Sequence, residues 1–203
     1  MMLPARYQFL IKDPKAPELV QAALRELGTL EGGGSANSST IIQWADEVAH
    51  ADPTPYTKWA ADWYNKDSVA WCGLFAALCA VRSANGKTNR LPPKNYLSAL
   101  AWAAFGNPVQ WRGREGLRLN EIKVGDVAVF TRDGGGHVAI IVGVTSGGQY
   151  VVCIGGNQDN SVSIKQFPIG RLYAVRRPPY AVTPLGARHV RLSPSGPVSI
   201  NEA

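Results

Sequence analysis

The sequence predicts an α+β fold in which helices come first and antiparallel strands follow. Up to about residue 116, apolar residues recur at helical spacing, whereas the later part alternates short β-branched segments with glycine-rich turns. No strand–helix–strand alternation joins the two halves, and short loops between the strands favour an antiparallel meander. We expect about five strands, at residues 126–130, 137–144, 150–154, 162–167 and 172–177.

Helix start and stop signals divide the first half into segments. Asp13 and Pro14 look like an N-cap and a first helical residue ahead of "APELVQAALREL", which Gly28 would end. Thr40 and Gln43 form a capping box before "IIQWADEVAHA". The stretch "YTKWAADWY" predicts one or two further helical turns, and "NYLSALAWAAFG" predicts another helix.

The segment "SVAWCGLFAALCA" predicts a buried helix with Ser68 as its cap and Asn85 near its end. Its apolar stripe consists of Trp71, Leu74, Phe75, Leu78 and Val81. Cys72 therefore lies in the first turn, and Cys79 lies about two turns further along the helix.

Length and composition indicate one globular domain with tails, since 45% of the 203 residues are hydrophobic and 18% are charged. No apolar run approaches the roughly 18 residues of a transmembrane segment. The N-terminus lacks the apolar core of a signal peptide, so we expect synthesis in the cytoplasm and delivery by another device. Three cysteines, an odd number, do not indicate a disulfide scaffold, and no His/Cys spacing suggests a metal site.

The net charge of +6 is concentrated in the C-terminal part of the chain. Between residues 160 and 201 there is no acidic residue, and the basic ones are Lys165, Arg171, Arg176, Arg177, Arg188 and Arg191. A basic end favours anionic partners such as bacterial envelope polymers, although a solvated tail has the same composition. No recognition motif accompanies the charge, so nucleic acid is not an expected partner.

The three cysteines differ in their predicted surroundings. At the start of a helix, the dipole and the unpaired N–H groups stabilise a thiolate and lower the pKa of Cys72. Cys79, inside the same helix, and Cys153, inside a strand, are predicted to be packing residues. Cys72 is therefore the candidate nucleophile.

A nucleophilic cysteine needs a base and a group that orients the base. Among the three histidines, His137 opens a strand directly after a glycine run, where the start of a helix can approach it. A hairpin would return the "GGNQDN" turn to the same sheet edge. There, Asn157 or Gln158 can offer a side-chain carbonyl to the imidazole, with Asp159 as a substitute.

These motifs resemble a known family. "AWCGLFAALCA", "GDVAVF", "GGGHVAIIVGV" and "VCIGGNQDNSVSI" are similar to the cysteine peptidoglycan hydrolases of the NlpC and CHAP type, which are compact papain-like domains. The resemblance spans about residues 17–178. It leaves residues 1–16 as an N-terminal extension and residues 179–203 as an extended or disordered tail.

The resemblance implies a role for each motif residue. Cys72 matches the nucleophile, His137 the base and Asn157 the orienting residue, with no metal or other cofactor. The common CHAP pattern has a Glu two positions before that Asn, where this chain has Gly155. Three further expectations concern substrate contact: Trp71 borders the site, Gln158 is a second oxyanion donor beside the Cys72 N–H, and Glu31 contacts a substrate amine.

The implied activity is hydrolysis of an amide bond in the stem peptide of peptidoglycan, through a thioester intermediate. Three alternatives stay open: an N-acetylmuramoyl-L-alanine amidase, a papain-like protease or deamidase acting on protein, and a non-catalytic envelope-binding module. Such an enzyme would act in the periplasm or cell wall. It would arrive there as an endolysin released with a holin, or as a secreted antibacterial effector paired with an immunity protein.

Overall fold

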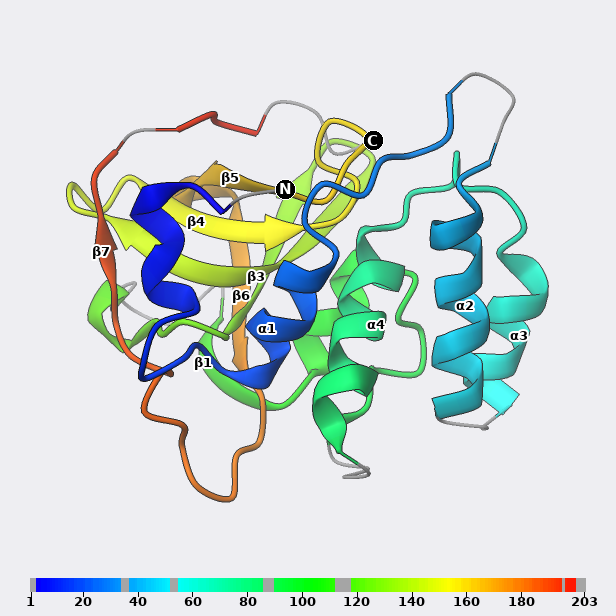
Figure 1. Cartoon of the computed structure of the whole chain (residues 1–203), viewed down its shortest axis with the longest axis horizontal. Coiled ribbons are helices and arrows are strands. Elements are labelled where there is room, and N and C mark those ends of the chain that lie inside the picture. The colour runs from blue at the N-terminus through cyan, green and yellow to red at the C-terminus, as the bar shows by residue number, and fades with distance from the viewer. Residues whose placement is uncertain are drawn as a thin grey trace.

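The computed structural model describes residues 3–33, 37–51, 55–85, 90–111, 118–194 and 196–199. A curved antiparallel sheet forms one side of the molecule, and the α-helices form the other (Figure 1). Helices α1 (Glu18–Arg25) and α4 (Cys72–Ala84) lie next to the sheet, and α2 (Ser39–Ala51) and α3 (Pro55–Trp63) lie outside them. The predicted α+β class, with helices before an antiparallel sheet, is confirmed.

Helix α4 is buried on nearly all sides because it lies between the sheet and α2. Of its residues only Arg82 is not buried, and that side chain connects three helices. Its guanidinium donates to Glu47 of α2 over 2.6 and 2.8 Å, and to Glu26, just after α1, over 2.5 Å. The predicted end of α4 is observed at Asn85, which adopts a left-handed φ of 48°.

Two helical segments differ from the sequence prediction. The first α-helix begins at Glu18 after Pro17, and the chain before it forms a short 3₁₀ helix, η1 (Ala5–Leu10). The stretch "NYLSALAWAAFG" forms turns and a 3₁₀ helix, η3 (Ala99–Ala104), instead of an α-helix. One cause is a local side-chain bond: the Tyr96 carbonyl accepts from the Trp102 indole N–H at 2.9 Å and not from an α-helical backbone N–H.

The sheet has the strand order β1-β6-β2-β3-β4-β5, with antiparallel neighbours throughout. Its strands are β1 (Asn107–Trp111), β2 (Val127–Arg132), β3 (Gly135–Thr145), β4 (Tyr150–Gly155), β5 (Ser163–Pro168) and β6 (Leu172–Arg177). The five predicted strands correspond to β2 through β6. Strand β6, however, pairs with β2 and not with its predecessor β5, and β1 was not predicted.

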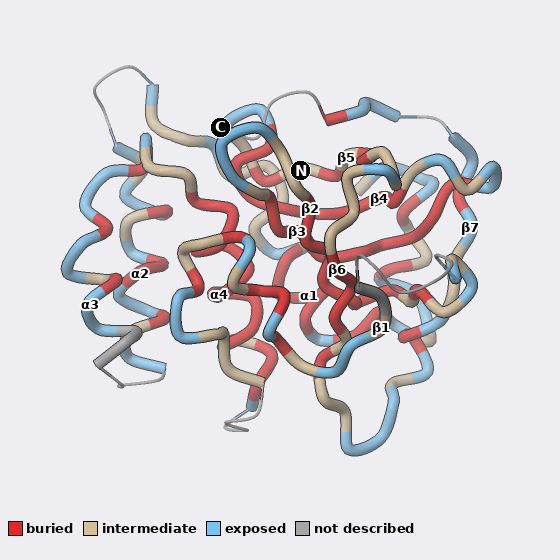
Figure 2. Tube along the Cα trace, turned by 180° about the vertical axis from the view of Figure 1, so that it is seen from behind, coloured by how far each residue is buried: buried red, intermediate tan, exposed pale blue. Residues whose placement is uncertain are grey.

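The residues of the central strands are buried (Figure 2), and each face of the sheet contributes to a hydrophobic core. One face packs against the helices through residues such as Val129, Val138 and Ile140. The other face encloses a smaller core that includes Phe130, Ala139 and Phe167. Because side chains alternate along a strand, His137 lies on the same face as Ala139, within the smaller core.

The segments outside residues 17–178 are part of the packed structure where they are described. Strand β7 (Arg191–Leu192) runs parallel to β3, and the Leu192 side chain is buried in the main core. Further along, Gln166 of β5 receives a hydrogen bond from the Ser199 N–H at 2.9 Å. The N-terminal extension contributes Tyr7 and Leu10 to the core. Within the described residues 179–194 and 196–199, β7 and a parallel bridge between Val198 and Gln166 join the chain to the sheet.

No helix in the described part of the chain is both long enough and apolar enough to cross a membrane.

Candidate active site

Cys72 is the first residue of α4, and Trp71 is the N-cap. The helical hydrogen bonds begin at the N-cap, because the Phe75 N–H donates to the Trp71 carbonyl at 2.9 Å. The next residue, Gly73, lies against the turn that precedes η3: a Cβ there would be 2.2 Å from the Tyr96 carbonyl oxygen. Only glycine allows this approach, which fixes the position of the first helical turn.

The Cys72 thiol is 3% exposed, and burial raises its pKa. Hydrogen bonds from the backbone N–H groups of Val138, Gly73 and Cys72 itself, together with the charge of Arg132, act in the opposite direction. The sequence prediction of a lowered pKa was wrong in its net direction, because it considered the helix start and not the burial. The contact with Val138 places the thiol beside the strand residue that follows His137.

The His137 imidazole is buried in an aromatic stack. Its ring centroid lies 5.1 Å from that of Phe167, with 15° between the planes. Phe167 in turn stacks on Phe130, the cross-strand partner of His137, at 4.5 Å. Rings on this face of the sheet therefore hold the imidazole plane in one orientation.

Gln158 is the residue whose side chain contacts the imidazole. His137 Nε2 lies 3.2 Å from Gln158 Oε1. The Gln158 amide nitrogen donates to the Ser163 carbonyl at 2.7 Å and to its Oγ at 3.3 Å, which determines which amide atom faces the histidine. Because Oε1 can only accept, Nε2 donates to it, and Nδ1 is then the basic nitrogen of the neutral ring.

Gly155 makes the space for this contact. A Cβ on Gly155 would lie 2.4 Å from Gln158 Oε1, closer than any side chain tolerates. Asn157, Asp159 and Asn160 all have positive φ, from 52° to 56°. These left-handed residues form the tight turn that folds Gln158 back toward His137. Gly155, which stands where the common CHAP pattern has a Glu, thus leaves room for the Gln158 side chain.

Asn157, the orienting residue implied by the resemblance, is not the group seen against the ring. It is 1% exposed, with a φ of 56°, and its Oδ1 has no hydrogen-bond partner among the described residues. The sequence left open whether Asn157 or Gln158 orients the His137 ring. The left-handed backbone at residue 157 makes the two side chains point in different directions. The expected oxyanion role of Gln158 conflicts with its contacts, because its amide nitrogen is already bonded to Ser163.

Trp71 and Glu31 lie together under the site. The Trp71 indole is fully buried and donates to Glu31 Oε2 at 2.9 Å. Its ring also covers Gly156, where a Cβ would lie 2.6 Å from Trp71 Cζ3. Trp71 therefore supports the loop that carries Gln158 and offers no surface to a substrate, whereas Glu31 is only half-buried.

Two charged residues in this region, Asp67 and Arg132, were not singled out by sequence reasoning. Asp67 is buried, and its Oδ2 accepts from the Gly32 and Ser38 N–H groups, each at 2.7 Å. Burial, with the charges of Asp67, Glu31 and Cys72, raises the pKa of Tyr64, so all three groups lie within electrostatic range of the Tyr64 hydroxyl. Arg132 approaches from β2. Neither Asp67 nor Arg132 belongs to a local motif that would identify it.

The α+β scaffold, with a cysteine at a helix start and a strand histidine whose ring contacts a side-chain amide, is consistent with the papain-like fold of cysteine hydrolases. The sequence model of the CHAP domain family matches residues 41–157, more than half of the chain. The chain therefore belongs to the CHAP family, whose members are typically cysteine- and histidine-dependent amidases or peptidases that act on peptidoglycan.

The matched region contains Cys72, His137 and Asn157, and ends one residue before Gln158. No curated protein and no solved structure matches the chain.

Proposed function

We propose that this protein hydrolyses an amide bond in the stem peptide of peptidoglycan, with Cys72 as nucleophile, His137 as base and Gln158 as the residue that orients the base. The observation that carries the proposal is that α4 brings Cys72 to the start of the strand that contains His137. The Cys72 thiol meets the Val138 N–H beside His137, and His137 Nε2 is held by Gln158 at 3.2 Å.

In the first step, His137 Nδ1 accepts the thiol proton, and the Cys72 sulfur attacks the amide carbonyl. A thiol whose pKa is raised by burial is mostly protonated at neutral pH, so it depends on such a base. The N–H groups of Cys72 and Gly73 point toward the sulfur and would stabilise the oxyanion of the tetrahedral intermediate.

In the second step, the His137 imidazolium protonates the departing amine, which leaves the acyl group on Cys72 as a thioester. Water then attacks the thioester while His137 Nδ1 takes its proton, and the carboxylate product leaves. Gln158 keeps the proton of the neutral ring on Nε2 throughout this cycle. It also accepts from the imidazolium when the ring is charged.

The surroundings of the site favour a peptide substrate. Gly135 has no neighbouring atom within 4 Å of a built Cβ, so the chain before His137 leaves room for an extended backbone. Trp44, Trp71 and Trp102 are buried and offer no platform for a sugar. Cations near the site, Arg132 among them, suit the carboxylates of a stem peptide.

One observation favours a second candidate, an N-acetylmuramoyl-L-alanine amidase. Trp59 and Trp63 of α3 are 42% and 54% exposed, with ring centroids 6.4 Å apart. The chain continues from Trp63 directly to Tyr64, beside the thiol. Two neighbouring exposed aromatic rings are suited to stacking on sugar.

The masses of the products from purified peptidoglycan test the proposal. We expect fragments cut within the stem peptide, and none from the Cys72→Ala protein. Release of intact stem peptide from muramic acid would identify the amidase. Binding to the polymer without any product would identify the non-catalytic module, and cleavage or deamidation of protein alone would identify the papain-like protease or deamidase.

We propose further that the protein acts in the periplasm or cell wall. Expression with an added export signal should lyse bacteria, and the Cys72→Ala protein should not. Equal toxicity with and without export would argue for a target in the cytoplasm.

A further inference from the structure

A cavity of about 380 Å³ lies where β2 ends and the hairpin to β3 begins. It is lined by Thr131, Arg132, Asp133 and Arg171. We propose that this cavity binds a carboxylate on the peptide substrate and so selects a peptide that carries a free acid near the cleaved amide. The inference rests on the proposed function, and it adds the substrate group that is recognised and the residues that recognise it.

Both arginines are anchored to backbone carbonyls through their Nε atoms. Arg132 Nε donates to the Gly136 carbonyl at 3.3 Å, and Arg171 Nε donates to the Thr131 carbonyl at 3.2 Å. The Thr131 hydroxyl also donates to the Arg171 carbonyl, at 3.4 Å. These bonds hold two planar guanidinium groups at the wall of one cavity. A guanidinium fork matches the two oxygens of a carboxylate and loses little side-chain entropy when it is already positioned.

Both arginines of the cavity contact residues next to the proposed catalytic groups. Gly136, whose carbonyl holds Arg132, immediately precedes His137, and the charge of Arg132 reaches the Cys72 thiol. On the other wall, Arg171 lies over the Phe167 ring at 6.0 Å, and Phe167 stacks on His137 at 5.1 Å. A peptide whose amide carbonyl lies at Cys72 can therefore place a neighbouring carboxylate in the cavity.

The lining also contains one carboxylate, that of Asp133, so variants of the lining should either weaken or strengthen substrate binding. Asp133 is exposed at the hairpin turn and carries the charge opposite to that of the two arginines. Two positive groups against one negative group leave the cavity positive. A substrate carboxylate would have to compete with Asp133 for the guanidinium groups. Removing Asp133 should thus strengthen binding, whereas removing Arg171 should weaken it.

The experiment uses two synthetic stem peptides that differ only in one group: the acid beside the cleaved bond is free in one and amidated in the other. For the free acid, Arg171→Gln should raise KM on the order of 10-fold, because a charge-assisted hydrogen bond is lost. Asp133→Asn should lower KM, and Arg171→Lys, which keeps the charge without the fork, should give an intermediate value. For the amidated peptide all three variants should match the wild type.

Arg191→Gln is the control, since Arg191 is an exposed arginine on β7, outside the cavity lining. It should change KM for neither peptide. The proposal is overturned if Arg171→Gln affects both peptides equally, or neither. Thermal unfolding of each variant identifies any that fails to fold. If Arg171→Gln does not fold, the KM of Asp133→Asn for the free-acid peptide tests the proposal, because it should decrease.

Calorimetric titration of the Cys72→Ala protein with the same two peptides separates this inference from the proposed function. Tighter binding of the free acid, lost in a Cys72→Ala/Arg171→Gln protein, supports the cavity assignment even if the wild type cleaves neither peptide. Equal binding of both peptides, or binding of neither, contradicts it even if the wild type is an active hydrolase.

Discussion

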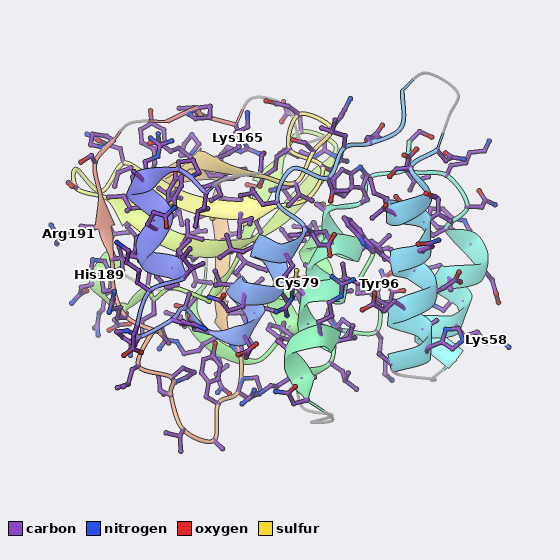
Figure 3. All side chains as sticks on the ribbon, viewed as in Figure 1. Lys58, Cys79, Tyr96, Lys165, His189 and Arg191 are labelled. Carbon is purple, nitrogen blue, oxygen red and sulfur yellow. The ribbon has the colours of Figure 1, made fainter. Side chains whose placement is uncertain are left out.

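Helix α4 carries one cysteine at its start and another in its middle, and the two have different surroundings. Cys72 and Cys79 are seven residues apart, close to one face of the same helix, and both are buried, at 3% and 0% exposure. Cys79 lies in the interior between α1 and α4 (Figure 3), where burial dominates and raises the pKa of its thiol. At Cys72, burial is opposed by backbone N–H groups from its own first turn and from Val138.

The comparison shows that burial alone does not distinguish a reagent from a packing residue. Cys153, in the middle of β4, is also fully buried, and burial is the only influence that raises the pKa of its thiol. Cys72 differs because it lies where a helix begins and where the His137 strand arrives. Position at the junction of two elements supplies the groups that a nucleophile needs.

The largest expected effect is on activity, and it distinguishes Cys72 from Cys79. Cys72→Ala should lower kcat/KM by roughly 1,000-fold or more, and His137→Ala should be similarly damaging, because nucleophile and base act as a unit. Cys79→Ala should retain activity and lose about 1 to 2 kcal/mol of unfolding free energy through the small cavity it leaves. Hydrolysis rates and denaturant unfolding curves measure the two effects. Retained hydrolysis by Cys72→Ala would eliminate the assignment.

The next effect concerns the residue that orients the base. Gln158→Ala should lower kcat by roughly 10- to 100-fold, since a misplaced imidazole still has its basic nitrogen. Asn157→Ala should keep most of the activity, at a cost of about 1 kcal/mol in stability, because alanine is strained at the left-handed φ of 56°. The reverse ranking of the two kcat values would return the role to Asn157.

Gly155→Ala should reproduce the Gln158→Ala defect without touching Gln158 itself. The added Cβ would lie 2.4 Å from Oε1 and would displace the amide from His137. In the Gly155→Ala/Gln158→Ala protein the two losses should not add, because both remove the same contact. Gly33→Ala is the matched control, since nothing lies within 4 Å of a Cβ there. Additive losses in the double variant would place the effect of Gly155 elsewhere.

A smaller effect concerns pH. Because burial raises the pKa of the Cys72 thiol, its thiolate fraction grows as pH rises, and its alkylation should accelerate between about pH 7 and pH 9. Arg132→Gln removes a charge that lowers this pKa, so the rate profile should move to higher pH. Arg191→Gln should leave the profile in place. A profile that is flat from pH 7 upward would mean that the thiolate already predominates at neutral pH.

The smallest effect on activity is expected from the C-terminal segment. Leu192→Ala should lower the unfolding free energy by about 2 to 3 kcal/mol, because the side chain is buried against the core beside β3. Activity at low temperature should be unchanged, since Leu192 lies outside the catalytic contacts. A folded, equally stable Leu192→Ala protein would show that the segment is not part of the core.

Local signals in the sequence were sufficient for α4, for Cys72 at its start and for strands β2 to β6. Each depends on periodicity and turn residues that are close together in the chain. The pairing of β6 with β2 and the addition of β1 and β7 depend on contacts between distant segments. Gln158 could not be separated from Asn157 because its direction follows from left-handed φ values and from the space beside Gly155. Asp67 gave no signal because its partners lie about 30 residues away.

The rate of iodoacetamide alkylation at each cysteine, mapped by mass spectrometry near neutral pH, tests the central claim most directly. We expect Cys72 to react much faster than Cys79 and Cys153, loss of hydrolysis to follow Cys72 modification in a one-to-one ratio, and His137→Ala to slow that reaction. Equal alkylation of the three thiols, or full activity with Cys72 modified, would contradict the assignment of Cys72 as the nucleophile.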